Sequence, residues 1–383
     1  MSEFIPFSVP EISNEEINEV IDTLRSGWIT TGPKVKQFES DFQDFIGSGV
    51  EAVAVNSATS GLHLALEALG VREGDEVIIP SLTFTATAEV VRYLGADVKI
   101  IDVNPVTLNI DVKAIRDAIT PNTKVIMPVH YAGLSCDMNE VLLLAKEFDL
   151  NVVEDAAHAL PTTYKGDMIG SLESDITVFS FYANKTMTTG EGGMVVTRNS
   201  DLAKRMKIMR LHGIDRDAFD RFQSKKPAWY YEVIAPGFKY NMTDIAAAMG
   251  IHQLKKLPGF LDRRKYLAKR YYDSLASLPL ILPADDADSG SHSWHLFVVR
   301  LKDNSPVNRD ELIQILSDQG IGTSVHYVPL HRQPYWRDKY QLAVDMFPVT
   351  DRAYQAMLSI PLYTAMTDKQ QDRVVQVLRD ALT

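Results

Sequence analysis

The chain has 383 residues, of which 45% are hydrophobic and 23% are charged, which is ordinary for a folded globular protein. Its formal net charge of -11 argues against nucleic acid or an anionic membrane surface as the main partner. No apolar run approaches the roughly 18 residues of a membrane span, and the single cysteine, Cys136, has no internal disulfide partner. We therefore expect a soluble, cytoplasmic protein in which Cys136 is a loop or packing residue.

The first predicted element is a helix. Ser13 and Glu16 have the spacing of a capping box, and apolar residues follow at helical spacing until Gly27. Short apolar runs then alternate with helical patterns. The predicted strands are residues 53–55, 76–79, 98–102, 124–129, 151–154, 176–181 and 194–197. Strands that alternate with helices indicate βαβ units, so we predict an α/β fold with a mostly parallel sheet that binds its ligand at the carboxyl ends of the strands.

The pattern changes in the last third of the chain. Residues 243–276 form a long amphipathic stretch, which predicts a helix or helix pair. After it, the pattern predicts a strand at SWHLFVVRL (residues 293–301), a helix that ends at Gly320, and a final helix over residues 369–382. We therefore divide the chain into a large α/β domain, residues 1–250, and a smaller C-terminal α+β domain, residues 251–383.

Three polar side chains are predicted to lie at the ends of neighbouring strands. Asp155 ends one apolar run, and Ser180 and Lys185 follow the end of the next. This acid, hydroxyl and amine suit pyridoxal 5'-phosphate (PLP), because the amine forms a Schiff base with the aldehyde and the carboxylate keeps the ring nitrogen protonated. Asp155 alone would also suit a helix cap, and an isolated lysine is usually a surface charge. The combination, followed by the Gly-rich segment GEGG, favours a cofactor site.

The segments SFYANKTMTTGEGGM (residues 180–194) and VVEDAAHA (residues 152–159) resemble the DegT/DnrJ/EryC1/StrS family of PLP-dependent aminotransferases of nucleotide-linked sugars. The resemblance covers nearly the whole chain and implies fold type I, the aspartate aminotransferase-like fold. It implies that Lys185 carries the cofactor and later moves the substrate proton. It also implies that Asp155 contacts the pyridine nitrogen and that His158 lies near the phenolic oxygen, although a lone histidine is more often structural.

Further cofactor contacts are expected at two other strand ends and from a second subunit. NSATSG (residues 56–61) opens a helix, and with Ser180 it predicts a phosphate cradle built from Ala58 and Thr59. Phe84 matches the aromatic residue that stacks on the pyridine ring, where the L-arabinose relatives are expected to carry Trp. Asn241, in PGFKYNMTD, matches an asparagine that reaches the phosphate of the neighbouring subunit, which implies a homodimer with shared sites. A helix cap is the other interpretation of Asn241.

The substrate residues are predicted from three segments of the family pattern. These are SGWITTGPKV (residues 26–35), HSWHLF (residues 292–297) and GIGTSVHYVPLH (residues 320–331). The predicted substrate contacts are Trp28, Thr30, Lys239, His326 and Tyr327, and Arg210 is a further candidate for positive charge. We expect no metal ligands.

The resemblance favours amino transfer from L-glutamate to a UDP-linked 4-keto sugar, in the biosynthesis of lipopolysaccharide or another cell-surface polysaccharide. The motifs look most like UDP-4-amino-4-deoxy-L-arabinose aminotransferases. A transaminase for UDP-2-acetamido-4-keto-6-deoxyhexose is a close rival, which the motifs do not separate. A sugar dehydratase of the same family carries histidine in place of the lysine, so Lys185 speaks against it. A non-catalytic PLP-binding regulator would need an output module, and no such module or basic patch is visible in the sequence.

Overall fold

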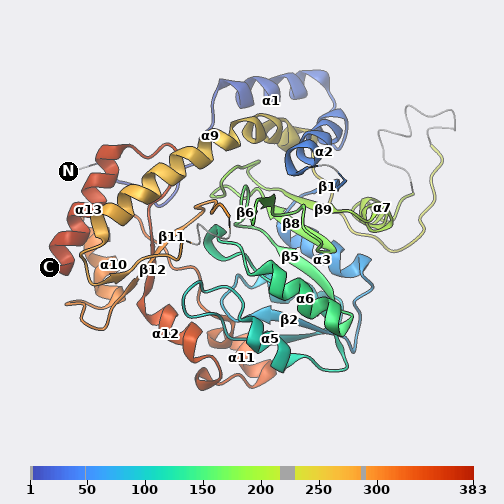
Figure 1. The fold of residues 1–383 in the computed structure, drawn as a ribbon. Helices are drawn as coiled ribbons and strands as arrows, with labels where there is room; N and C mark the ends of the chain where they lie inside the picture. The colour runs from blue at the N-terminus through green and yellow to red at the C-terminus, as the bar shows by residue number, and fades with distance from the viewer. Residues whose placement is uncertain (1–2, 48, 216–228, 286–289) are drawn as a thin grey trace.

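A seven-stranded sheet forms the centre of the larger part of the chain (Figure 1). The computed structural model describes residues 3–47, 49–215, 229–285 and 290–383. The strand order is β1-β9-β8-β5-β4-β2-β3, and neighbouring strands are parallel except that β9 is antiparallel to β1 and β8. The strands are β1 (Glu51–Val55), β2 (Glu76–Pro80), β3 (Asp97–Ile101), β4 (Thr123–Ile126), β5 (Asn151–Asp155), β8 (Ile176–Ser180) and β9 (Gly193–Thr197). The predicted α/β fold with a mostly parallel sheet is therefore confirmed.

The predicted strand 124–129 is shorter in the structure. It ends at Ile126, because Pro128 has no N–H to continue the ladder. Beyond the proline, an isolated parallel bridge between Val129 and Asp155 continues the pairing with β5.

Helices cover both faces of this sheet. Successive strand residues alternate between two apolar clusters: Val53 packs with one cluster, and its neighbour Ala54 packs with the other. Helices α2, α5 and α6 contribute to the cluster of Ala54, and α3, α4 and α7 contribute to the cluster of Val53. The bounds are α2 (Pro33–Ile46), α3 (Ala58–Ala68), α4 (Ala86–Tyr93), α5 (Val112–Ala118), α6 (Met138–Phe148) and α7 (Ser200–Met209). Burial on both faces explains why these strands are nearly continuous apolar runs.

The long helix α9 (Asp244–Leu275) links this part of the chain to the C-terminal part (Figure 1). It is one helix and begins at an N-cap formed by Thr243. Helix α1 (Asn14–Ser26) packs along one side of it. The capping box of Ser13 and Glu16 is present, and Gly27 ends α1 with a φ of 76°. The predicted division at residue 250 falls inside α9, and it stays a prediction.

The C-terminal part has its own core around a three-stranded antiparallel sheet, β10-β11-β12. Its elements are β10 (Leu280–Ile281), β11 (Phe297–Leu301), α10 (Arg309–Asp318), α11 (Pro334–Tyr340), α12 (Pro348–Ala356), β12 (Met357–Ile360) and α13 (Asp368–Leu382). The small elements of the chain are β6 (Thr163–Tyr164), β7 (Asp167–Met168), η1 (Tyr131–Gly133), η2 (Leu330–Arg332) and η3 (Val344–Met346). Ile5 joins the C-terminal core and exchanges backbone hydrogen bonds with Gly320 and Gly322, each 2.8 Å long. The start of the chain therefore packs against its last third.

The predicted strand at residues 293–301 begins only at Phe297. Its first residues hydrogen bond to loops of the large sheet, with Ser293 N donating to Gly133 O and Leu296 N donating to Ala132 O, both at 3.2 Å. This segment therefore joins the two parts of the chain.

Asp244 fixes the start of α9 to the start of α2. Its carboxylate accepts backbone N–H groups from Gly32 at 2.7 Å, Val35 at 3.0 Å and Lys34 at 3.1 Å. The side chain is buried, and burial raises the pKa of this carboxyl group in spite of the three donors. A carboxylate at a helix N-terminus satisfies N–H groups that have no partner inside the helix.

We predict that Asp244→Ala lowers the free energy of unfolding of the cofactor-free protein by about 3 kcal/mol, because it removes three hydrogen bonds to a charged acceptor. Urea unfolding measures the change. Asp262→Ala, at an exposed position of the same helix, is the matched control and should change stability by less than about 0.5 kcal/mol. Equal effects of the two substitutions would contradict the anchoring role of Asp244.

Candidate active site

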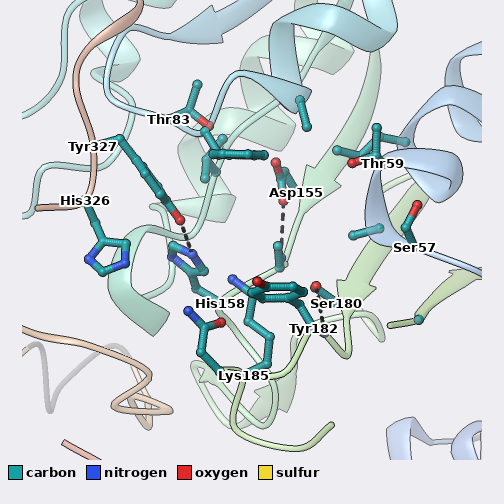
Figure 2. A pocket seen from close by; sticks show the side chains of 18 of the residues that line it. Ser57, Thr59, Thr83, Asp155, His158, Ser180, Tyr182, Lys185, His326 and Tyr327 are labelled. Atoms are coloured by element: carbon teal, nitrogen blue, oxygen red, sulfur yellow. Dashed lines mark hydrogen bonds between the residues drawn. The ribbon is translucent and has the colours of Figure 1, made fainter. Parts of the chain in front are cut away.

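A cavity of about 470 Å³ lies at the carboxyl ends of the parallel strands (Figure 2). The predicted site residues that line it are Ala58, Thr59, Phe84, Asp155, His158, Ser180, Lys185, His326 and Tyr327. Asp155 ends β5 and Ser180 ends β8, while Ala58 follows β1 and Phe84 follows β2. The chain thus brings side chains from four strand ends to one place, as the topology of an open α/β sheet requires.

Asp155 is a buried carboxylate on the floor of this cavity. Its Oδ2 accepts the Thr87 hydroxyl at 2.8 Å, and its Oδ1 accepts the backbone N–H of Ala157 at 3.2 Å. Burial raises the pKa of Asp155, whereas the two hydrogen bonds and the charge of Lys185 act in the opposite direction. A protonated nitrogen that bound here would favour the ionised carboxylate. The carboxylate would in turn keep that nitrogen protonated.

Lys185 lies in the loop after β8 and lines the cavity together with Asp155 (Figure 2). Burial of its amine lowers the pKa of Lys185 to about 8, although the nearby charge of Asp155 raises it. The neutral fraction of this amine near physiological pH is therefore a minority, but it is far larger than for an ordinary lysine with a pKa of 10.5. A neutral amine is the form that attacks a carbonyl carbon.

The N-terminus of α3 forms another side of the cavity. Ser57 is its N-cap and accepts the N–H of Ser60, while Ala58 and Thr59 occupy the first turn. Backbone N–H groups in a first helical turn have no acceptor inside the helix, so they favour an anion. Gly193 permits this arrangement, since a Cβ at this position would stand 2.8 Å from the Ala58 nitrogen.

His158 and Tyr327 form the opposite side. His158 Nε2 lies 2.8 Å from the Tyr327 hydroxyl, and the two rings lie 6.0 Å apart (Figure 2). The ring of Phe84 lies 5.6 Å from that of Tyr327. Next to them, His326 bonds through Nδ1 to Ser359 at 2.8 Å, and burial lowers the pKa of His326 to about 4.

Four predicted residues are not among the described residues that line this cavity: Trp28, Thr30, Lys239 and Asn241. They lie together instead. Lys239 Nζ donates to Asn241 Oδ1, and Asn241 Nδ2 donates to Thr31 Oγ1 at 2.6 Å. Their predicted roles stay predictions.

Arg210, the further candidate for positive charge, has a different position. It is 2% exposed, and its guanidinium donates to Glu39 and to the Ala54 carbonyl. The charge of Arg210 is therefore neutralised inside the protein, and this residue is not among those that line the cavity. Cys136 is buried in the core, as expected for a packing residue.

The structure adds site residues that the sequence did not single out. Thr87 bonds to Asp155, and Tyr182, Asn184 and Glu191 line the cavity. Thr87 follows Thr83 by one helical turn, with the two hydroxyls 2.7 Å apart, so the TFTAT spacing was an available signal. The other three lie in the lysine segment itself, where only the fold decides which side chains face inward.

The donors present fit PLP. A buried carboxylate suits the ring nitrogen, an amine of lowered pKa suits the aldehyde, and a helix N-terminus with Ser180 suits the phosphate. Phe84 lines the same cavity and offers an aromatic surface for the ring.

Comparisons with known proteins agree with this chemistry. A model of the DegT/DnrJ/EryC1/StrS aminotransferase family matches residues 10–379. The spore coat polysaccharide biosynthesis protein SpsC of Bacillus subtilis (strain 168) is 45% identical over 379 residues, which are 98% of this chain and 97% of that protein. The PLP form of the putative sugar aminotransferase Spr1654 from Streptococcus pneumoniae superposes with a TM-score of 0.91 at 35% identity, over 100% of both chains. Helicobacter pylori PseC, an aminotransferase involved in the biosynthesis of pseudoaminic acid, has a TM-score of 0.91 at 27% identity, over 99% of each chain.

The fold and the cavity define a PLP-dependent enzyme of fold type I. The chain belongs to the DegT/DnrJ/EryC1/StrS aminotransferase family, and its cofactor is PLP. Among the residues that the structure describes, no helix is long and apolar enough to cross a membrane.

We predict that the cofactor-free protein captures PLP at Lys185 with a rate that rises as the pH passes through about 8, because only the neutral amine adds to the aldehyde. Borohydride trapping followed by peptide mass analysis measures the modification at this residue. Asp155→Asn should move the midpoint to lower pH, since the carboxylate raises the pKa of Lys185. A midpoint near 10.5, the ordinary value for lysine, would contradict a desolvated amine.

Proposed function

We propose that the protein transfers the amino group of L-glutamate to C4 of a UDP-linked 4-keto sugar. The observation that carries the amino-transfer chemistry is the Lys185 amine, whose pKa is lowered to about 8, in one cavity with the buried carboxylate of Asp155. The names of the similar proteins support a sugar acceptor, because SpsC belongs to polysaccharide biosynthesis and Spr1654 is described as a sugar aminotransferase. We place the reaction in the cytoplasm, in the biosynthesis of a cell-surface polysaccharide.

Each residue of the cavity has its own proposed role in the reaction. PLP supplies a ring that accepts electrons and a carbonyl carbon that carries the amino group between the two substrates. Asp155 keeps the ring nitrogen protonated, and Phe84 covers the ring. The first turn of α3 would hold the phosphate, and Lys185 would serve as the base that moves the proton at the substrate carbon.

The outer part of the site must accept a sugar diphosphate. His326, Tyr327, Tyr182 and Glu191 line the cavity but supply no fixed positive charge, and the chain as a whole carries -11. Pyrophosphate binding therefore needs further donors. We propose that Trp28, Thr30, Lys239 and Asn241 supply them from the neighbouring subunit of a homodimer. Lys239 and Asn241 are linked to Thr31, and none of the four lines the cavity of its own chain, which supports this assignment.

Three alternatives remain: a different acceptor sugar, a dehydratase and a non-catalytic regulator. UDP-2-acetamido-4-keto-6-deoxyhexose differs from the L-arabinose type at C2 and C6, and the described residues that line the cavity do not separate the two sugars. Lys185 disfavours a dehydratase of the same family, which carries histidine at this position. A non-catalytic regulator is disfavoured because the sequence shows no DNA-binding module or basic patch.

We predict turnover of glutamate to 2-oxoglutarate only with a nucleotide-linked keto-sugar present. A panel of UDP- and dTDP-linked keto-sugars, with product analysis by NMR, identifies the base and the aminated carbon. Removal of the nucleotide should reduce kcat/KM far more than a change at C6, because remote contacts position the reacting carbon. Lys185→Ala should abolish turnover. Equal rates with free keto-sugars, or amination at C3, would rule out this substrate.

A shared site makes a further prediction about mixed dimers. Asn241→Ala and Lys185→Ala subunits, each impaired alone, should regain part of the activity after they are mixed and allowed to exchange. One of the two sites in the heterodimer then carries both substitutions and the other carries neither. Mass spectrometry of the intact dimers demonstrates exchange. Exchange without any recovery would show that each site is complete within one chain.

A further inference from the structure

Two threonines connect the carboxylate of Asp155 to the wall of the cavity. Thr87, in the first turn of α4, donates its hydroxyl hydrogen to Asp155 Oδ2 at 2.8 Å. The hydroxyl of Thr83, four residues earlier in the chain, lies 2.7 Å from the hydroxyl of Thr87. Thr83 lines the cavity together with Asp155 (Figure 2), whereas Thr87 is fully buried and is not among the lining residues. The three side chains therefore form one chain of hydrogen bonds inside the protein.

The ionised carboxylate fixes the direction of these hydrogen bonds. A carboxylate accepts hydrogen bonds and has no hydrogen to give, so the single hydrogen of the Thr87 hydroxyl is used by Asp155. The Thr87 oxygen then accepts, and the hydrogen between the two hydroxyls comes from Thr83. Donation by Thr83 polarises the Thr87 hydroxyl and strengthens its bond to the carboxylate. Each bond in this arrangement favours the charged form of Asp155.

Burial acts against that charge. It raises the pKa of Asp155, and two hydrogen bonds to the carboxylate lower it. One bond comes from the backbone N–H of Ala157, 3.2 Å from Oδ1, and the shorter one comes from Thr87. Thr87 is therefore the side chain whose removal tests how the carboxylate is kept charged.

The other charged or titratable groups near Asp155 come from three further parts of the chain. Lys185 and His130 lower the pKa of Asp155 through their positive charge. The ring of His130 also lies 2.8 Å from the Glu154 carboxylate, which is its own partner. Tyr327 stays uncharged, because burial raises its pKa. Within the described part of the chain, the two threonine hydroxyls bond to none of these groups, so a change at Thr87 acts on Asp155 directly.

We propose that Thr87 and Thr83 are positioning residues that keep Asp155 ionised for the ring nitrogen of the cofactor. Thr87 acts on the carboxylate, and Thr83 acts through Thr87. The assignment rests on the proposed role of Asp155 at that nitrogen, since an ionised carboxylate keeps the nitrogen protonated.

The first test measures the pKa of Asp155 in the cofactor-free protein. Carbon-13 NMR of aspartate-labelled protein follows the carboxyl group with pH, and the spectrum of Asp155→Asn identifies its signal. Thr87→Val keeps the branched shape and removes the donor, so the pKa should rise by about one unit. Thr87→Ser keeps the hydroxyl and should retain the pKa of the wild type. Thr83→Val should give a smaller rise, because Thr87 still donates.

Thr85→Val is the matched control. Thr85 lies between the two threonines in the sequence, but its hydroxyl bonds to Glu89 at 3.0 Å and to Trp336 at 3.1 Å, and it is not among the described residues that line the cavity. This variant should leave the pKa of Asp155 unchanged. Thr87→Ala removes the same donor as Thr87→Val and replaces it if the valine variant does not fold.

Three outcomes would overturn the assignment. The first is an unchanged pKa of Asp155 when the Thr87 hydroxyl is removed. The second is a rise of equal size in Thr85→Val. The third is a rise that also occurs in Thr87→Ser, which would show an effect of packing and not of the hydrogen bond.

A second measurement separates this assignment from the role of Asp155 in the proposed function. Equilibrium titration gives the dissociation constant of PLP for the wild type and for Thr87→Val over a range of pH. The constant of the variant should be about tenfold higher at acidic pH, where fewer of its carboxyl groups are ionised, and should approach the wild-type value as the pH rises. A pKa that moves without this change in affinity would contradict the ring-nitrogen role of Asp155. The two proposals therefore fail on different measurements.

Discussion

The site depends on two opposite charges that are both partly removed from water. Burial raises the pKa of Asp155 and lowers that of Lys185, and each group acts against the shift of the other. Neither would be stable in its charged form alone in this cavity. Their proximity follows from the parallel pairing of β5 with β8, where Asp155 is in register with Val178 and lies just before the end of the neighbouring strand. The pairing of these strands therefore places the Asp155 carboxylate where its charge acts on the pKa of Lys185.

The sheet and the charged pair could be predicted from sequence because both depend on local pattern. Apolar runs of strand length mark β5 and β8, and a polar residue at the end of such a run must face a partner or a ligand. For Thr87 the TFTAT spacing gives only a local signal, and its partner could not be assigned in this way, since the bond to Asp155 joins segments 68 residues apart. The same limit applies to residues 293–296, which have a strand pattern but bond to loops of the large sheet, and to Ile5, which packs with the C-terminal core.

Phosphate recognition in an acidic protein needs donors that do not add to its net charge. In the proposed site the first turn of α3 provides them as backbone N–H groups, and Gly193 keeps the neighbouring strand from filling the space. Asn241 is different: it bonds to Thr31 and Lys239 within its own chain, and only an assembly of two chains decides whether it also reaches a phosphate.

The backbone next to the cavity orients the ring of His158. The resemblance implies that His158 lies near the phenolic oxygen of the cofactor, and in the structure the N–H of Ala132 donates to His158 Nδ1 at 3.2 Å. Ala132 has a φ of 57°, in the left-handed region that non-glycine residues seldom adopt, and this conformation costs about 1 kcal/mol. The next residue, Gly133, has no Cβ, and one placed there would stand 2.0 Å from Ser293 Oγ. An unfavourable backbone conformation is thus kept next to the cavity, where the Ala132 N–H bonds to His158 and His158 bonds to the Tyr327 hydroxyl.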